Sequence, residues 1–407
     1  MKILMVQDIG WLYGGGEIYV NNIKKELEKR GHIVKVFSSN INLKNNKEKQ
    51  IADYLCYGTN GKFAKLMMIF NPFALFKIKK ILKEFKPDIV HIHSFFYNLS
   101  PSILIPAKKF PTVMTLHNYI LFCMSGYKHF PNYECCNQPY GKICRKMKCV
   151  SAKQYYTQYL ARLLINKLIK NIDLFIAVSS YVEKLAKQAG YTNVKMLNNA
   201  IDEKLFRFKK LPQKQRLFYC GRLVEEKGVK YLLQAIPSIL NRFPKMHLDI
   251  AGSGPLLENL KALAKDLKIE KNVHFLGNIP NNKLEDYYHR SSIVFVPSIW
   301  PDNSPVVIYE TMASGRPVIA SNVGGIPDLI VNGITGCLIP PKNSEEIAKK
   351  TINLLKNKRL LERMGYNARD RVLKLFTMKK HINTLENIYN NLTKKYNQKH
   401  HAIDKKT

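Results

Sequence analysis

Residues 2–37 read KILMVQDIGWLYGGGEIYVNNIKKELEKRGHIVKVF, and this stretch decides the fold. The apolar run from Ile3 to Val6 has the length of a buried strand, and Gly14-Gly15-Gly16 predicts a loop after it. Apolar residues at helical spacing follow at Ile18, Ile23 and Leu27. The run from Ile33 to Phe37 is a second strand. A strand, a loop, a helix and a strand in this order predict a parallel sheet with right-handed crossovers.

The same alternation continues along the chain. In the first half, further strands are expected at residues 89–92, 112–116 and 174–178. In the second half, strands are expected at residues 217–220, 247–251, 273–276, 293–296 and 318–320. Helical patterns fall between them. The sequence therefore predicts an α/β protein with two doubly wound, Rossmann-like domains.

Breaks in this pattern suggest the domain boundaries. Asparagine, lysine and proline punctuate residues 198–212, so we place the first domain at 1–197 and the second at 198–375. An amphipathic segment and a polar tail make up residues 376–407, and we expect the final helix to return to the first domain. Parallel sheets place their ligand loops at the carboxyl ends of the strands. A cleft across which the two domains face each other is therefore the expected site.

Composition and charge narrow the class of protein. The 407 residues are 46% hydrophobic and 23% charged, which indicates a globular chain rather than a disordered one. A net charge of +35 favours anionic partners, but it is spread over both halves, as on an ordinary solvated surface. The apolar run at the N-terminus is too short for a secretion signal, and no run reaches the roughly 18 residues that span a bilayer. We therefore expect a cytoplasmic protein that does not bind nucleic acid.

Two loops carry groups that suit phosphate. Gly15 and Gly16 open the first helix, where bare backbone amides can approach an anion, although a tight structural turn explains the same residues. Their spacing is not the Gly-x-Gly-x-x-Gly of dehydrogenases. Beyond the strand at 217–220, Arg222 and Lys227 lie five residues apart on a loop that we expect to be exposed. An arginine fork and a lysine point charge can together stabilise a departing diphosphate without a metal.

The most informative segment is 296–320, which reads VPSIWPDNSPVVIYETMASGRPVIA and places Asp302 eight positions before Glu310. It resembles the carboxylate motif of retaining glycosyltransferases of family 4, the group 1 glycosyltransferases, which have the GT-B fold. Further parts of the family pattern occur in the expected order: Gly14 to Gly16, Thr115-Leu-His-Asn118, Asn199-Ala-Ile-Asp202, the loop at 221–228 and Gly324-Gly-Ile-Pro-Asp328. The resemblance extends over nearly the whole chain.

The resemblance implies a reaction and the residues that bind the donor. The reaction is transfer of a sugar from a nucleoside-diphosphate sugar to a lipid-linked or polysaccharide acceptor, with retention of configuration and with no metal or cofactor in catalysis. Arg222 and Lys227 match the diphosphate clamp, and Glu310 matches the residue that binds the ribose hydroxyls. Gly15 and Gly16 match the glycine-rich loop on the donor side.

The same resemblance implies which residues contact the transferred sugar. Asp302 matches the acid that holds sugar hydroxyls, together with the neighbouring Asn303, Pro305 and Val306. Family members more often have Glu at this position, so the identity of the sugar stays open. His117 matches a histidine that contacts the donor sugar near the anomeric centre, whereas by itself it is explained as an imidazole bonded to a loop carbonyl. The implied catalytic set is completed by the two clamp cations.

Cysteines cluster in an insert at residues 123–149. Five of the eight fall there, namely Cys123, Cys135, Cys136, Cys144 and Cys149. A structural zinc ion would tie down such a polar loop, but the gaps lack Cys-x-x-Cys pairs. Disulfides and reduced thiols are the alternatives that the sequence leaves open.

Two basic regions suit the acceptor side of the reaction. Residues 128–153 mix lysine and arginine with tyrosine and phenylalanine, and we expect them to recognise a glycan or lipid-linked acceptor. Residues 63–86 mix apolar side chains with lysines such as Lys77, Lys79, Lys80 and Lys83, a pattern that suits an anionic lipid surface and a peripheral location on the inner membrane face. Ordinary core helices explain the second region equally well.

Two rival functions remain. A nucleotide-sugar epimerase of the same fold would bind the same donor but need no acceptor. A nucleic-acid-binding protein would use the basic charge instead and would bind with steep salt dependence.

Overall fold

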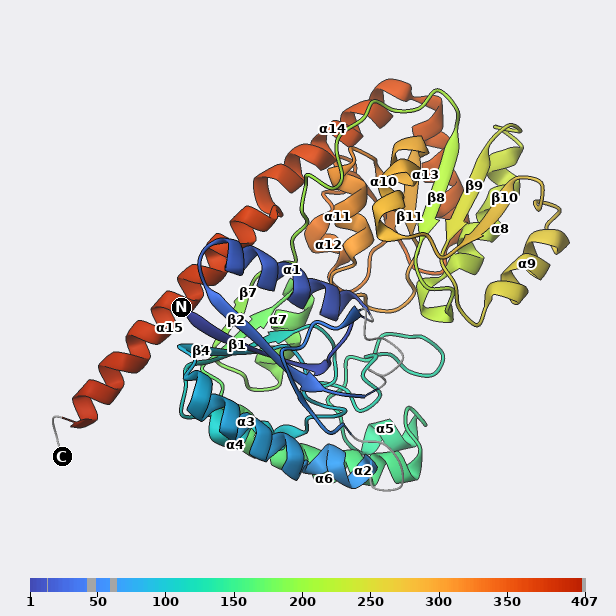
Figure 1. Ribbon diagram of the computed structural model, residues 1–407. Coiled ribbons are helices and arrows are strands. Elements are labelled where there is room, and N and C mark those ends of the chain that lie inside the picture. The colour runs from blue at the N-terminus through green and yellow to red at the C-terminus, as the bar shows by residue number, and fades with distance from the viewer. Residues whose placement is uncertain (13, 42–48, 59–63, 405–407) are drawn as a thin grey trace. The chain divides into compact units, whose positions relative to one another are not determined.

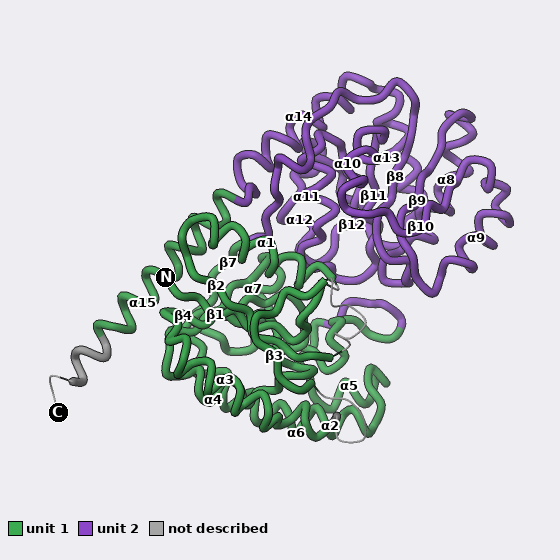
Figure 2. The backbone as a smooth tube through the Cα atoms, in the orientation of Figure 1, with its two compact units in different colours: residues 1–131, 137–197, 379–407 green, residues 132–136, 198–378 purple. Residues whose placement is uncertain are grey.

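The computed structural model describes residues 1–12, 14–41, 49–58 and 64–404. Their contacts divide the chain into two compact units (Figure 2). Unit 1 consists of Met1–Pro131, Asn137–Leu197 and the residues from Lys379 onward. Unit 2 consists of Asn132–Cys136 and Asn198–Met378. A short piece of the cysteine-rich insert therefore groups with unit 2, although the sequence analysis placed the whole insert in the first domain.

Unit 1 is built on a seven-stranded sheet with the order β3-β2-β1-β4-β5-β6-β7, in which all paired strands are parallel. Its strands are β1 (Lys2–Ile9), β2 (Ile33–Ser39), β3 (Tyr54–Cys56), β4 (Ile89–Ile92), β5 (Thr112–Leu116), β6 (Leu174–Ala177) and β7 (Val194–Met196). The central strands are fully buried because helices cover both faces of the sheet.

Helices of unit 1 pack on both faces of this sheet. They are α1 (Gly15–Lys29), α2 (Ala64–Ile69), α3 (Pro72–Phe85), α4 (Leu104–Ala107), α5 (Lys142–Lys146), α6 (Ala152–Leu168), α7 (Ser180–Gln188) and α15 (Met378–Asp404). Figure 1 shows α1 and α15 on one side of the sheet, with α3 and α6 on the other. The 3-10 turns η3 (Pro101–Ile103) and η4 (Ile169–Asn171) extend α4 and α6.

The last helix, α15, buries an apolar stripe in unit 1. The buried residues are Ile382, Leu385, Ile388 and Tyr389, at the spacing of one helix face. The Tyr389 hydroxyl lies 2.6 Å from Nδ1 of His91 on β4. The Tyr19 hydroxyl on α1 lies 2.7 Å from Nε2 of His381. These contacts tie the end of the chain to its beginning.

Unit 2 is built on a six-stranded parallel sheet with the order β10-β9-β8-β11-β12-β13. The strands are β8 (Arg216–Cys220), β9 (His247–Ala251), β10 (Val273–Gly277), β11 (Ile293–Val296), β12 (Val318–Ser321) and β13 (Gly336–Ile339). The helices are α8 (Val229–Leu240), α9 (Leu257–Asp266), α10 (Asn281–Arg290), α11 (Val306–Ala313), α12 (Ile326–Leu329), α13 (Ser344–Lys356) and α14 (Lys358–Leu375), with the 3-10 turn η5 (Glu225–Lys227). Two apolar clusters, one on each face, form its core.

The predicted α/β architecture with two doubly wound sheets is confirmed. All ten predicted strands are present, with small shifts at their ends. The short strands β3, β7 and β13 were missed.

Candidate active site

The order of unit 2's sheet reverses between β8 and β11. Loops that leave the two strands at such a switch point diverge to opposite faces and leave a crevice for ligands at the carboxyl edge. The loop after β8 carries Arg222 and Lys227, and the loop after β11 carries Asp302. Three of the residues that the sequence singled out are therefore brought to one edge of one sheet.

An ion pair joins these two loops. Nζ of Lys227 lies 2.5 Å from Oδ2 of Asp302, and the Ser298 hydroxyl donates to the same oxygen at 3.3 Å. Nζ also lies 5.6 Å from the centre of the Trp300 ring. Asp302 is buried and Lys227 is half-buried, so water screens their attraction only weakly. The expectation of an exposed Lys227 is wrong, because Asp302 draws the ammonium inward.

Arg222 behaves differently from its neighbour. Its side chain is exposed, as expected, while its backbone carbonyl accepts a hydrogen bond from the Tyr219 hydroxyl at 3.1 Å. This bond fixes the backbone just after β8 and leaves the guanidinium in solvent. The fork of donors is therefore available to an anion that reaches the loop.

Glycines let these loops approach one another closely. Gly228 has a φ of +65°, and a Cβ atom there would lie 2.1 Å from the carbonyl oxygen of Pro297. A Cβ at Gly254, after β9, would lie 2.3 Å from the carbonyl oxygen of Leu223. Contacts this short are forbidden to any larger residue. Gly254 was not among the predicted site residues, although a Gly-Ser-Gly directly after a predicted strand is a recognisable loop signal.

Glu310 projects from α11, whose start follows the Asp302 loop. The Tyr288 hydroxyl donates to Glu310 Oε2 at 2.6 Å. Burial raises the pKa of the Glu310 carboxyl, and the Tyr288 hydrogen bond opposes this shift. Asn303 is buried, Pro305 precedes the first residue of α11, and Val306 begins it with an exposed side chain. Tyr288 is a site neighbour that the sequence analysis missed, since it lies on α10 far from any motif.

The switch point of unit 1 lies between β1 and β4, and a buried aspartate spans it. Asp8, near the end of β1, accepts backbone hydrogen bonds from Tyr97, Asn98 and Leu99 at 2.8–3.0 Å. The Ser94 hydroxyl donates to it at 3.1 Å. Burial raises the pKa of Asp8, and these donors oppose the rise. Asp8 was not predicted, and it organises the loop that follows β4.

At the start of α1, the Glu17 side chain accepts a hydrogen bond from one backbone amide of the glycine loop. Glu17 accepts hydrogen bonds from the backbone N–H of Gly14 at 3.0 Å and from Gln7 Nε2 at 2.5 Å. Burial raises the pKa of this carboxyl. Among the described residues, a Cβ placed at Gly15 would meet no atom within 4 Å, and the nearest atom to one at Gly16 would be Gln7 Nε2 at 3.9 Å. The glycine loop therefore has open space beside it but already carries a carboxylate.

His117 lies just beyond β5 in a cluster of imidazoles. Its Nε2 lies 3.1 Å from Nδ1 of His93. Burial lowers the pKa of His117 to about 4 and that of His91 to about 3, so both rings are neutral near pH 7. Nε2 of His91 also bonds the Thr115 hydroxyl at 2.7 Å. His91 is thus a packing residue, and half-buried His117 is the member closest to solvent among these three.

The structure gives the zinc hypothesis no support. Within residues 1–12, 14–41, 49–58 and 64–404, no group of three or more His, Cys, Asp or Glu side chains is arranged to hold a metal ion. All eight cysteines lie in this part of the chain, and none forms a disulfide. Cys144 packs with Met124 and Val150 in a small apolar cluster that Cys149 also joins. Cys135 and Cys136 belong to the segment that groups with unit 2. The cluster in sequence therefore does not become a ligand set.

The suspected lipid-facing region has an exposed apolar surface. Phe63, its first residue, lies outside the described residues. On α2 and α3 and between them the exposed side chains are Leu66, Phe70, Phe73 and Phe76. On α6, which packs against α2, they are Tyr156, Tyr159, Leu160 and Leu163. We call the latter the apolar face of α6. Among the described helices, none combines the length and the apolar character needed to cross a bilayer.

Two family models match the chain in tandem. The model for Glycosyltransferase Family 4 matches residues 13–205, and the model for Glycosyl transferases group 1 matches residues 201–371. The first ends and the second begins close to the boundary between units 1 and 2.

Similar proteins agree with these matches. An uncharacterized glycosyltransferase of Methanocaldococcus jannaschii is 32% identical over 173 residues, which is 42% of this chain and 44% of the relative. One of Haemophilus influenzae is 31% identical over 215 residues, or 50% and 60% of the two chains. The chain thus spans about half the length of these relatives.

Solved structures of the same fold cover more of the chain. Anabaena HepE, solved in complex with UDP, superposes with a TM-score of 0.70 at 18% identity and covers 96% of this chain and all of its own. Sucrose-phosphate synthase from Thermosynechococcus elongatus superposes with a TM-score of 0.72 at 19% identity, covering 96% and 98%. At this identity the likeness establishes the fold. Because two tandem family models and these folds agree, the chain belongs to the family 4, group 1 glycosyltransferases and has the GT-B fold.

Proposed function

We propose that the protein is a retaining glycosyltransferase that moves a sugar from a nucleoside-diphosphate sugar to a lipid-linked or polysaccharide acceptor. The observation that carries the proposal is the Lys227–Asp302 ion pair at the switch point of unit 2, beside exposed Arg222. It puts donors for phosphate and acceptors for hydroxyls at one edge of a sheet, in a member of a glycosyltransferase family. A neighbour of the same fold, HepE, was solved with UDP, which supports a nucleoside diphosphate as the ligand.

The diphosphate would be held by the two cations of the loop after β8. The Lys227 ammonium has three donors, and Asp302 takes one of them, so it can bond a phosphate oxygen while the ion pair persists. The exposed guanidinium of Arg222 could donate two parallel N–H hydrogen bonds to a phosphate. Both charges would stabilise the negative charge that grows on the departing diphosphate, and the reaction then needs no metal.

The carboxylates would bind the hydroxyls of the donor. Ionised Glu310 can accept both hydroxyls of the ribose diol, and the Tyr288 hydrogen bond favours its ionised form. Asp302 would hold hydroxyls of the transferred sugar, with Asn303, Pro305 and Val306 forming the adjoining loop. Acceptor attack on the face that the diphosphate leaves would retain the anomeric configuration, and neither acid needs to act as a nucleophile.

His117 would contact the transferred sugar. Its low pKa keeps the imidazole neutral, so its ring can donate one hydrogen bond and accept another. His93 Nδ1 lies 3.1 Å from Nε2 of this ring, which helps to fix the orientation of the imidazole. The role of Gly15 and Gly16 would be to leave room for a ligand beside the start of α1, where their missing side chains open space.

The apolar face of α6 favours a lipid surface as a further partner. Tyr156, Tyr159, Leu160 and Leu163 recur at helical spacing and all are exposed. The α6 sequence contains no acidic residue, and exposed lysines lie on it and on α3. Apolar side chains beside cations suit a membrane with anionic headgroups. The cytoplasmic location and the inner membrane face remain predictions from the sequence.

A panel of donors tests the proposal and its rivals. UDP-, GDP- and ADP-sugars are first ranked by thermal shift, since a ligand that binds only the folded chain raises its melting temperature. The donor that binds is then incubated with and without membrane lipid extract or polysaccharide. Sugar transfer that needs the acceptor is expected. Conversion of the donor alone to another nucleotide sugar would identify an epimerase. No nucleotide binding, with tight salt-dependent duplex binding, would replace the proposal with the nucleic-acid function.

A further inference from the structure

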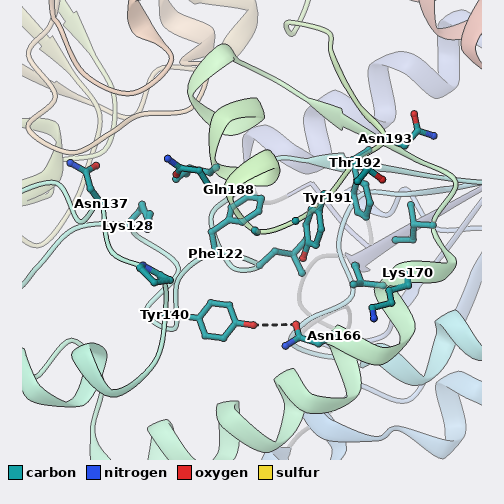
Figure 3. A pocket seen from close by; sticks show the side chains of 18 residues that line it. Phe122, Lys128, Asn137, Tyr140, Asn166, Lys170, Gln188, Tyr191, Thr192 and Asn193 are labelled. Carbon is teal, nitrogen blue, oxygen red and sulfur yellow. Dashed lines mark hydrogen bonds between the residues drawn. The ribbon is translucent and has the colours of Figure 1, made fainter.

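A large pocket in unit 1 is lined by none of the residues proposed above to bind the donor, although Lys128 and Tyr140 of the basic segment 128–153 contribute to it. Its volume is about 810 Å³, within the usual range for small-molecule sites. Its lining includes Leu121 and Phe122, residues 188–193, and Asn166 of α6. In Figure 3 the rings of Tyr140 and Tyr191 lie centrally, between Lys128 and Lys170. All of these residues belong to unit 1.

Fixed aromatic rings and amides shape this pocket. Tyr191 stacks on Phe175 with ring centres 4.6 Å apart and an angle of 11°. Tyr140 is held by Arg162, whose guanidinium lies 4.2 Å from the ring centre, and its hydroxyl donates to Asn166 at 3.1 Å. Rigid rings can pack against the C–H faces of sugars, and side-chain amides can bond their hydroxyls. Amides are supplied by Asn137, Asn166, Gln188 and Asn193.

The electrostatics of the pocket select for negative charge. Among the described residues that line it, none is Asp or Glu, whereas Lys128 and Lys170 are both present. Lys128 is only 2% exposed, and its Nζ donates to the backbone carbonyl of Gln138 at 2.7 Å. No ion pair between Lys128 and a carboxylate occurs in the described part of the chain. A buried ammonium without a counter-ion is costly unless a ligand supplies the charge.

The backbone of Lys128 adopts an unfavourable conformation. Its backbone has a φ of +59°, in the left-handed region that non-glycine residues seldom adopt. Such conformations persist where the surrounding structure gains from placing a particular side chain. The loop that positions Lys128 also carries Phe122, so one segment supplies both an aromatic wall and a charge.

We propose that this pocket binds an acidic saccharide unit, one that bears a carboxylate or a phosphate. This assignment rests on the proposed function: the saccharide would be part of the glycan acceptor. The pocket would bind acceptor sugars other than the one to which the transferred sugar is added. The wall residue Leu121 follows His117 by four positions, so the same loop leads from the proposed sugar contact to this pocket. All of the described residues that line it belong to unit 1.

A glycan panel tests the assignment. The probes are oligosaccharides of matched length that contain uronic acid, sugar phosphate or only neutral sugars, and binding is measured by fluorescence anisotropy. We expect the wild-type chain to bind one or both acidic sets at least tenfold more tightly than the neutral set. Lys170→Glu should lower acidic-glycan affinity at least tenfold. Lys184→Glu, an equal charge reversal at an exposed position of α7 outside the pocket, should leave it unchanged.

A second variant guards against misfolding and separates the two proposals. Tyr191→Phe keeps the stacked ring and serves as the folded control for Tyr191→Ala, which should lose acidic-glycan binding. Nucleoside-diphosphate affinity is measured in parallel and should not change in any pocket variant. Equal affinity for neutral and acidic glycans would reject the preference for an acidic saccharide. If the chain binds nucleotide but no glycan, the assignment of this pocket to a glycan is wrong. Glycan binding without nucleotide binding would instead reject the proposed function.

Discussion

Nζ of Lys227 lies 2.5 Å from Oδ2 of Asp302, so the predicted phosphate cation and the predicted sugar acid are direct partners. Each fixes the other: the carboxylate sets the direction of the ammonium, and the ammonium holds the buried carboxylate in place. Substitution of either residue should therefore disturb both stability and activity.

Removal of one partner leaves a buried charge behind. Lys227→Met should lower the free energy of unfolding by about 2 kcal/mol and abolish most donor turnover, because Asp302 would remain buried without its counter-ion. Urea denaturation and a donor-consumption assay measure the two effects. The double variant Lys227→Met with Asp302→Asn completes a mutant cycle. Its loss of unfolding free energy should be smaller, by about 1–2 kcal/mol, than the sum of the losses in the two single variants. Strict additivity would mean that the pair contributes nothing.

Exposed Arg222 should affect catalysis alone. Arg222→Ala should reduce donor turnover at least tenfold with a melting temperature close to that of the wild type, because its guanidinium lies in solvent. Arg242→Ala provides a matched control, since this arginine is also exposed in unit 2 but lies far along the chain from the loop after β8. If both variants turn over donor at the wild-type rate, Arg222 is not part of the diphosphate site.

Tyr288 should set the pH range in which Glu310 binds ribose. Its hydroxyl opposes the rise in the Glu310 pKa that burial causes. The ionised carboxylate is the form that accepts the diol, so affinity should fall as the pH drops through this pKa. Tyr288→Phe should move that fall to higher pH, whereas Glu310→Gln should remove it and weaken binding at every pH. Calorimetry with a nucleoside diphosphate between pH 5 and pH 8 checks both. An unchanged profile in Tyr288→Phe would refute the coupling.

Buried His91 should make the protein sensitive to acid. The unfolded chain protonates this ring below about pH 6.5, but the folded chain does so only near pH 3, so the unfolded state binds more protons between these values. Stability should therefore fall between pH 7 and pH 5, with about 2 kcal/mol of the loss from His91. His91→Gln, which cannot titrate, should lose less stability over the same interval in urea denaturation. His93 and His117, whose pKa values burial also lowers, are present in both proteins, so the comparison removes most of their contribution.

The apolar face of α6 should bind anionic vesicles. Leu160→Asp should reduce co-sedimentation with vesicles that contain phosphatidylglycerol at least fivefold, because it adds a negative charge to an exposed apolar surface. Leu375→Asp, at an exposed leucine of α14 in unit 2, is the matched control and should bind as the wild type does. Equal binding of both variants, or no preference for anionic over neutral vesicles, would contradict the lipid surface.

The central strands of the fold were predictable because each is an apolar run buried on both faces. Residues 293–296 illustrate this, since the observed strand has the predicted bounds. The missed strands β3 and β7 have only three residues each and lie at the two edges of their sheet, where little apolar area is buried. β13, at the edge of the other sheet, begins with Gly336, which weakened its signal.

The site was predictable only where side chains follow strands within a recognisable motif. Arg222, Lys227 and Asp302 could be placed on neighbouring loops, but not paired, because pairing depends on the strand order of the sheet. Tyr288 gave no signal, since a tyrosine on an amphipathic helix is ordinarily a core residue. The zinc hypothesis came from cysteines that are close along the chain. In the described residues these thiols do not come close enough together in space to bind one metal ion.

The bond between His91 and Tyr389 spans 298 positions of the chain, and it sets an order of assembly. While the protein emerges from a ribosome, unit 1 has all seven of its strands long before α15 is made, because the whole of Asn198–Met378 must be synthesised in between. Until then one side of its sheet lacks the apolar stripe of α15. Completion of the unit 1 core therefore waits until α15 has been translated.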